Sequence, residues 1–204
     1  MSTITNRGTG AGGAGTNASG LPFEENTDLR THYTVIETHR SKCSPVRNYE
    51  NITFNSDPTN TVYISSKKGS TKNIMKQLGY RNTNQVAIDG CIDPDETFLD
   101  EARGFFFIIE KKKQQGSGSV IEKLQGALMK KLVYERMYPI LEIKYVFCLS
   151  DWMRSDDEKN ANTVAKISAV LDILTEHGIP VFWGDEADYK ERIIEYITND
   201  SDYE

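Results

Sequence analysis

The sequence has no apolar run approaching the ~20 residues that a transmembrane helix needs. The N-terminus also lacks a basic segment followed by an apolar core, which a secretory signal requires. These absences argue against a membrane span and a signal peptide. We therefore expect a cytoplasmic protein with no membrane partner.

Cysteine and histidine are both scarce. The three cysteines, Cys43, Cys91 and Cys148, show no metal-ligand spacing, and we expect Cys91 and Cys148 to be small core residues in a reducing compartment. The three histidines are isolated from one another, so neither a histidine-metal nuclease nor a Ser-His-Asp hydrolase can be assembled. A Gly-x-x-x-x-Gly-Lys phosphate loop is also absent, which leaves an ATP-driven motor unsupported.

Positive charge is in deficit, because the formal net charge is −6. Proteins that coat nucleic acid non-specifically are basic, so this balance argues against that class. The charge is segregated, however: Asp and Glu concentrate toward the C-terminus, whereas lysines cluster between Lys67 and Lys113. The deficit therefore does not exclude a protein that acts on DNA through its basic part.

The chain is long enough for one domain with a substantial core, at 204 residues with 38% apolar residues. Residues 1–20 are mostly Gly, Ser, Thr and Asn, so we expect a flexible segment there. Residues 21–200 are expected to form the single folded domain. The acidic residues 201–204 are expected to be a frayed tail.

The hydrophobic pattern alternates between strand-like and helix-like segments. Runs rich in β-branched and aromatic residues predict strands at 33–37, 61–65, 85–88, 97–99, 105–109, 143–149 and 179–183. Helices are expected at 21–30, 70–79, 119–137, 188–197 and from a Ser155-x-x-Glu158 capping box to His177. The polar stretch 38–60 is expected to be mostly loop. The strand-helix order of the second half predicts an α/β fold with parallel β-α-β packing.

The most informative segment is Cys91–Ser119, CIDPDETFLDEARGFFFIIEKKKQQGSGS, which predicts a hairpin. Because side chains alternate along a strand, Glu110 and Lys112 leave one face and Lys111 leaves the other. Asp95, at the start of the first strand, can lie opposite them. Two carboxylates suit a hard cation such as Mg²⁺, and a lysine beside them can orient or deprotonate a water. The chemistry indicated is metal-assisted phosphodiester hydrolysis.

Pro94-Asp95 followed by Glu110-Lys111-Lys112 resembles the PD-(D/E)xK nuclease motif, and its surroundings resemble type II restriction endonucleases. The Gly-rich opening 12–24 and the segment 116–124 extend this resemblance over most of the chain. It implies a restriction-endonuclease-like core, with a central mixed sheet flanked by helices. It also implies Mg²⁺-dependent cleavage of double-stranded DNA at a specific short sequence.

The resemblance assigns roles within the motif. Asp95 and Glu110 are expected to be metal ligands, and Lys112 the lysine at the attacking water. Glu24, on the first helix, is expected to support the metal site. Gln114 shares the parity of Lys112 and is expected to hold a water or a phosphate.

Several alternatives stay open. Asp93 could replace Asp95 as the first ligand, and Lys111 or Lys113 could replace Lys112. A repair-type nuclease of the same superfamily is one alternative function. A DNA-binding or interaction module that keeps the nuclease fold without turnover is the other.

Polar side chains on both sides of the hairpin predict DNA contacts. Lys67 and Lys68, in the loop before the 70–79 helix, are suited to phosphates. Base recognition is expected from residues that follow the catalytic strand: Ser117, Ser119, Lys123, Gln125 and Arg136. Since palindromic duplex sites carry two scissile phosphates related by a two-fold axis, we expect a homodimer.

Overall fold

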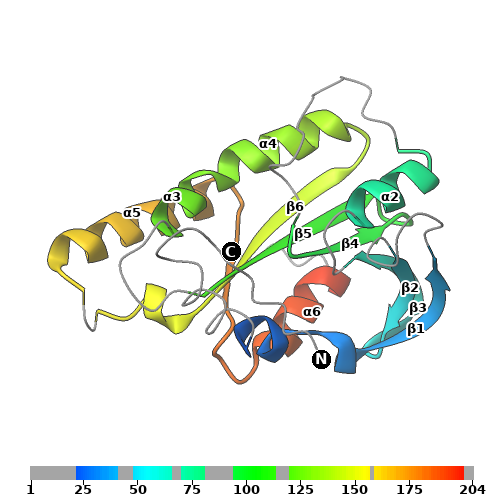
Figure 1. Ribbon diagram of the computed structural model, residues 1–204, viewed down its shortest axis with the longest axis horizontal. Coiled ribbons are helices and arrows are strands. Elements are labelled where there is room, and N and C mark those ends of the chain that lie inside the picture. Colours follow the sequence, from blue (N-terminus) through cyan, green and yellow to red (C-terminus); the bar gives the residue numbers. More distant parts are fainter. Residues whose placement is uncertain are drawn as a thin grey trace, which may run out of the picture.

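A computed structural model describes residues 22–40, 48–65, 70–80, 94–113, 120–156 and 159–199. They form a seven-stranded sheet in the order β1-β2-β3-β4-β5-β6-β7, with helices on both faces (Figure 1). Strands β1 to β5 pair antiparallel, whereas β5, β6 and β7 pair parallel. The expected α/β class, with a mixed sheet flanked by helices, is confirmed.

The strands are β1 (Tyr33–His39), β2 (Tyr49–Phe54), β3 (Asp57–Ser65), β4 (Glu96–Asp100), β5 (Phe105–Lys112), β6 (Glu142–Leu149) and β7 (Val181–Trp183). The helices are α2 (Ser70–Gln77), α3 (Val120–Gln125), α4 (Ala127–Met137), α5 (Ala161–Glu176) and α6 (Tyr189–Asn199). Short 3₁₀ turns are η1 (Arg30–His32) and η3 (Asp151–Met153), and residues 22–26 form a helical segment. None of the helices in these ranges has the length and apolar character needed to cross a membrane.

The first half of the sheet is a meander, and the expectation of a mostly loop region at 38–60 was wrong. β2 and β3 form a hairpin there. Tyr49, Ile52 and Phe54 of β2 are buried, while polar residues between them and in the exposed start of β3 obscure the strand pattern. The expected strand at 85–88 lies outside the described residues, as do the expected flexible ends at 1–20 and 201–204.

β5 separates two hydrophobic clusters because its side chains alternate between the faces of the sheet. Phe106 and Ile108 point into a cluster covered by α2, α3, α4 and α5. Phe107 and Ile109 point into a second cluster, covered by α6 and the 22–26 segment. Figure 1 shows α3 and α4 along one side of β5 and β6, with α6 on the other. The middle of β5 is therefore buried on both faces, whereas Lys111 and Lys112 at its end are only partly buried.

Three of the expected helices differ in their bounds. The helix expected at 21–30 covers only residues 22–26, followed by the 3₁₀ turn η1. The helix expected at 119–137 is divided at Gly126 into α3 and α4. α5 begins at Ala161, not at the Ser155 capping box, because the Asn160 side chain accepts a hydrogen bond from the Thr163 backbone N–H. Its end is as expected, since Gly178 follows the helix with a φ of 63°.

Candidate functional site

The β4–β5 hairpin brings the three motif residues together at one end of the sheet. The Lys112 ammonium lies 2.9 Å from Asp95 Oδ2 and 2.7 Å from Glu110 Oε2. Glu110 and Lys112 share a face of β5, and Asp95 directly precedes β4. The hairpin and the convergence of these side chains agree with the alternation in the sequence.

The oxygens around Lys112 form a small cage, which we define by Asp95 Oδ2, Glu110 Oε2 and the Lys111 carbonyl. The carbonyl accepts a 3.1 Å hydrogen bond from the same Lys112 nitrogen. Within the described residues, no group of three or more His, Cys, Asp or Glu side chains is arranged to hold a metal. A cation in this cage would therefore have only two carboxylates and a carbonyl as ligands from it.

The charged groups of the site stabilise one another in their ionised forms. Burial opposes ionisation of Glu110, but Lys112 and Lys130 outweigh it and lower the pKa of this carboxyl. Burial also opposes the charged form of Lys112, yet Glu110 and Asp95 raise its pKa above the ordinary value. Both groups are consequently held in their charged forms.

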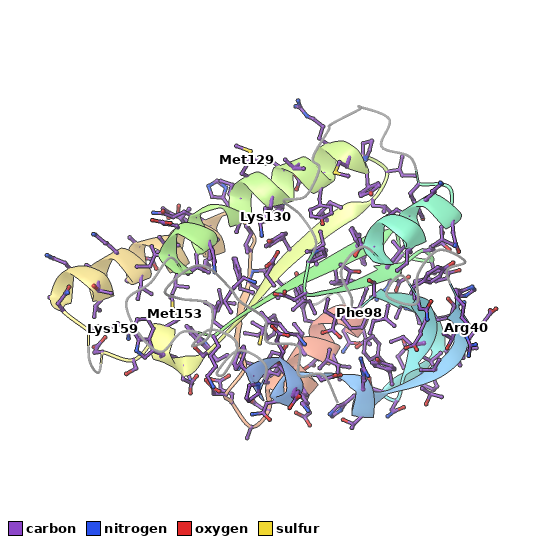
Figure 2. The ribbon with its side chains drawn as sticks, viewed as in Figure 1. Arg40, Phe98, Met129, Lys130, Met153 and Lys159 are labelled. Atoms are coloured by element: carbon purple, nitrogen blue, oxygen red, sulfur yellow. The ribbon has the colours of Figure 1, made fainter. Side chains whose placement is uncertain are left out.

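Lys130 of α4 also belongs to the site, although it was not among the site residues expected from the sequence. Its ammonium donates a 2.9 Å hydrogen bond to Glu110 Oε1. Figure 2 shows Lys130 on the side of α4 that faces the strands and Met129 on the outer side. The spacing of residues along the helix could not predict the Lys130–Glu110 contact, because this contact depends on how α4 packs across β5.

Glu24 lies close enough to the motif to interact with it. Burial and the negative charge of Asp95 raise the pKa of Glu24, while Lys111 and Lys112 oppose the shift. Both Glu24 and Asp95 line a pocket of about 200 Å³. The structure therefore brings this expected supporting residue next to Asp95.

Lys111 points to the opposite face of β5, where its ammonium has its own partners. Its ammonium lies 2.9 Å from the buried Glu96 carboxylate and donates to the Thr27 carbonyl at 3.0 Å. Its backbone N–H donates to Asp95 Oδ2 at 2.7 Å. Lys112, not Lys111, thus carries the ammonium at the motif carboxylates, while Lys111 links them to the segment at 22–27.

The expected DNA contacts divide into three groups. Four of them lie outside the described ranges: Lys67, Lys68, Ser117 and Ser119. The expected supporting residue Gln114 and the alternative ligand Asp93 also lie outside these ranges. Lys123 and Gln125 are exposed on α3. Along α4, Lys130 contacts Glu110, and Tyr134 and Tyr138, the residue after the helix, pack on Phe106 near the start of β5.

This direction of α4 separates the basic residues of the two helices. α3 precedes α4 and so lies toward the Glu110 end of β5. Arg136 lies near the other end of α4, one residue from its C-terminus. Lys123 and Gln125 therefore lie toward the Glu110 end of β5, and Arg136 lies toward its start.

Comparison of the chain with protein-family models, with curated proteins and with solved structures finds no match.

Proposed function

We propose that the protein is a Mg²⁺-dependent endonuclease that hydrolyses double-stranded DNA at a specific short sequence, as type II restriction enzymes do, on a restriction-endonuclease-like core. The observation that carries this proposal is the arrangement of Asp95, Glu110 and the Lys111 carbonyl around the Lys112 ammonium. The Lys112 ammonium, itself a cation, lies within hydrogen-bonding distance of all three oxygens.

The donor set fits a hard divalent cation. All three protein atoms of the cage are oxygens, which Mg²⁺ prefers, and Mg²⁺ keeps several waters when protein ligands are few. Bound there through Asp95 and Glu110, it would polarise a phosphate and lower the pKa of a bound water. Lys112 would orient the attacking water once the cation has replaced its ammonium among these oxygens. Glu24, beside Asp95, would support the site.

The DNA substrate is supported by the surroundings of this site. α3, with the exposed Lys123 and Gln125, lies toward the same end of the sheet. These side chains offer the donors and acceptors that base edges require. The lysines of the 65–72 loop, Lys67 and Lys68, are the proposed phosphate contacts.

The test is digestion of plasmid DNA with Mg²⁺ and again with excess EDTA. Discrete fragments that require Mg²⁺ are expected, and a smear would indicate a repair-type nuclease. Asp95→Ala and Lys112→Ala should each abolish cutting, whereas Lys131→Ala should not, because Lys131 pairs with Glu135. Unchanged cutting by the first two variants would remove these residues from the active site.

A second candidate is a DNA-binding module without turnover. It is favoured by the near balance of charge at the site, where Lys112 and Lys130 neutralise Asp95 and Glu110. Retained binding of duplex DNA with no cutting in Mg²⁺ or Mn²⁺ would select this candidate.

A further inference from the structure

Each carboxylate oxygen of Glu110 has its own lysine. Oε2 lies 2.7 Å from Lys112 in the cage, and Oε1 accepts the 2.9 Å hydrogen bond from Lys130. The Glu110 side chain is only 5% exposed, so water cannot replace either partner freely. Two contacts on opposite oxygens fix the plane of the carboxylate as well as its charge.

The two lysines reach Glu110 from different parts of the fold. Lys112 follows it on β5, whereas Lys130 comes from α4, in the crossover between β5 and β6. When a cation takes the place of the Lys112 ammonium in the cage, Oε1 still has its partner on α4. Lys130 is then the charged partner that orients Glu110, next to the Tyr145 hydroxyl, which also interacts with this carboxylate.

We propose that Lys130 is a positioning residue that holds Oε1 of Glu110, so that Oε2 faces the cage formed with Asp95 and the Lys111 carbonyl. This inference rests on the proposed function for the identity of the cation. Lys130 acts through Glu110 and does not itself bind the metal. Partners that orient a metal ligand in this way typically contribute about 10- to 100-fold to metal affinity.

α4 supplies a matched control. Lys131 is the next residue on the same helix, and its ammonium pairs with Glu135 one turn further on. Lys131→Met therefore removes the same charge and the same volume as Lys130→Met without touching Glu110. Lys130→Arg keeps the charge and a donor for Oε1.

The experiment is a calorimetric titration of the full chain with Mg²⁺. Lys130→Met should bind Mg²⁺ about 10- to 100-fold more weakly than the wild type. Lys130→Arg should recover most of the affinity, and Lys131→Met should bind as the wild type does. Lys130→Gln replaces the Met variant if the latter fails to fold; because its side chain is uncharged and shorter than lysine, a loss in the same direction is expected.

The outcomes separate this inference from the proposed function. Equal Mg²⁺ affinity in Lys130→Met and Lys131→Met overturns the positioning role, even if the wild type cuts DNA. A wild type that binds Mg²⁺ without cutting DNA overturns the proposed function, while a selective loss in Lys130→Met still supports the positioning role. A wild type that binds no Mg²⁺ overturns both.

Discussion

Glu110 is a buried carboxylate that stays ionised because Lys112 and Lys130 surround it. Its pKa is lowered from the ordinary 4.5 despite burial. The ion pairs therefore stabilise the fold fully above that pH, and this contribution is lost as the pH falls through the lower folded pKa. Glu110→Gln should be less stable at neutral pH by about 1–3 kcal/mol and should lose less stability below pH 4.5 than the wild type.

Urea unfolding of the two proteins as a function of pH measures this difference. Parallel curves at acidic pH would show that Glu110 does not carry the expected linkage.

Substitutions of the two neighbouring lysines of β5, Lys111 and Lys112, should differ in their effects on stability and on cutting. Lys111 is 7% exposed, and its partner Glu96 is 4% exposed. Burial raises the pKa of Glu96, and Lys111 is the group that opposes this shift most strongly. Lys111→Met leaves this buried carboxyl without its partner, at a cost of up to about 3–5 kcal/mol of folding free energy, the cost of breaking a buried ion pair. Adding Glu96→Gln should recover much of this loss, because no ionisable group is then left without a partner.

Chemical denaturation of the single and double variants gives the coupling energy. Additive losses would contradict the ion pair. Lys112→Met is the comparison, since Lys112 is 20% exposed and its partner Asp95 is 31% exposed; its loss should affect cutting more than stability.

At the scale of elements, the hairpin could be predicted from the sequence and the partners of α4 could not. Phe105–Ile109 has the period and residue types of a strand, so the common face of Glu110 and Lys112 followed directly. β2 was missed because two polar residues lie between Tyr49 and Ile52, which breaks the alternation that indicates a strand. Lys130 was missed because its contact with Glu110 depends on helix packing, which no local pattern encodes.

Gly184, directly after β7, is the point where the 22–27 segment packs most closely on the sheet. A Cβ there would lie 2.6 Å from Phe23 Cζ, 2.7 Å from Thr27 Cγ2 and 2.8 Å from Cys148 Sγ. Gly184→Ala should therefore destabilise the fold by about 1–3 kcal/mol through overpacking.

Gly126, between α3 and α4, provides the control for this substitution. A Cβ at Gly126 would meet only backbone oxygens at 3.5 and 3.7 Å, and its φ of −72° suits alanine. Gly126→Ala should stabilise by about 0.5–1 kcal/mol. Thermal unfolding measures both variants, and equal midpoints would refute the close packing at Gly184.

α3 and α4 carry exposed polar residues toward opposite ends of β5, which leads to a prediction about base recognition. Lys123→Ala or Gln125→Ala should weaken cutting at the cognate site by about 1–3 kcal/mol per lost bidentate contact. Arg136→Ala should have a smaller effect because α4 carries Arg136 toward the other end of β5.

Cleavage rates on the cognate duplex and on a duplex with one changed base distinguish the roles. Equal losses on both duplexes for Lys123→Ala would assign it to the phosphate backbone instead of the bases. A loss for Arg136→Ala as large as that for Lys123→Ala would contradict the placement of recognition on α3.

At the scale of the whole molecule, the sheet separates two hydrophobic clusters and carries the cage at one end of β5. The chain has a net charge of −6, and at this end Lys112 and Lys130 balance Asp95 and Glu110, with Lys123 on α3 toward the same end. The proposed function requires a DNA duplex to reach this end, because the cage lies there. Each protomer thus has one cage, which can act on one scissile phosphate at a time.

Cutting both strands of a duplex consequently requires either two protomers or two successive encounters. A homodimer places two identical sites about the two-fold axis of a palindromic sequence, so both strands are cut in one binding event. We predict that sedimentation with a cognate duplex gives a dimer, and that supercoiled plasmid becomes linear without accumulation of nicked circles. A monomer on DNA, together with nicked circles that precede linear product, would show that each strand is cut in a separate encounter.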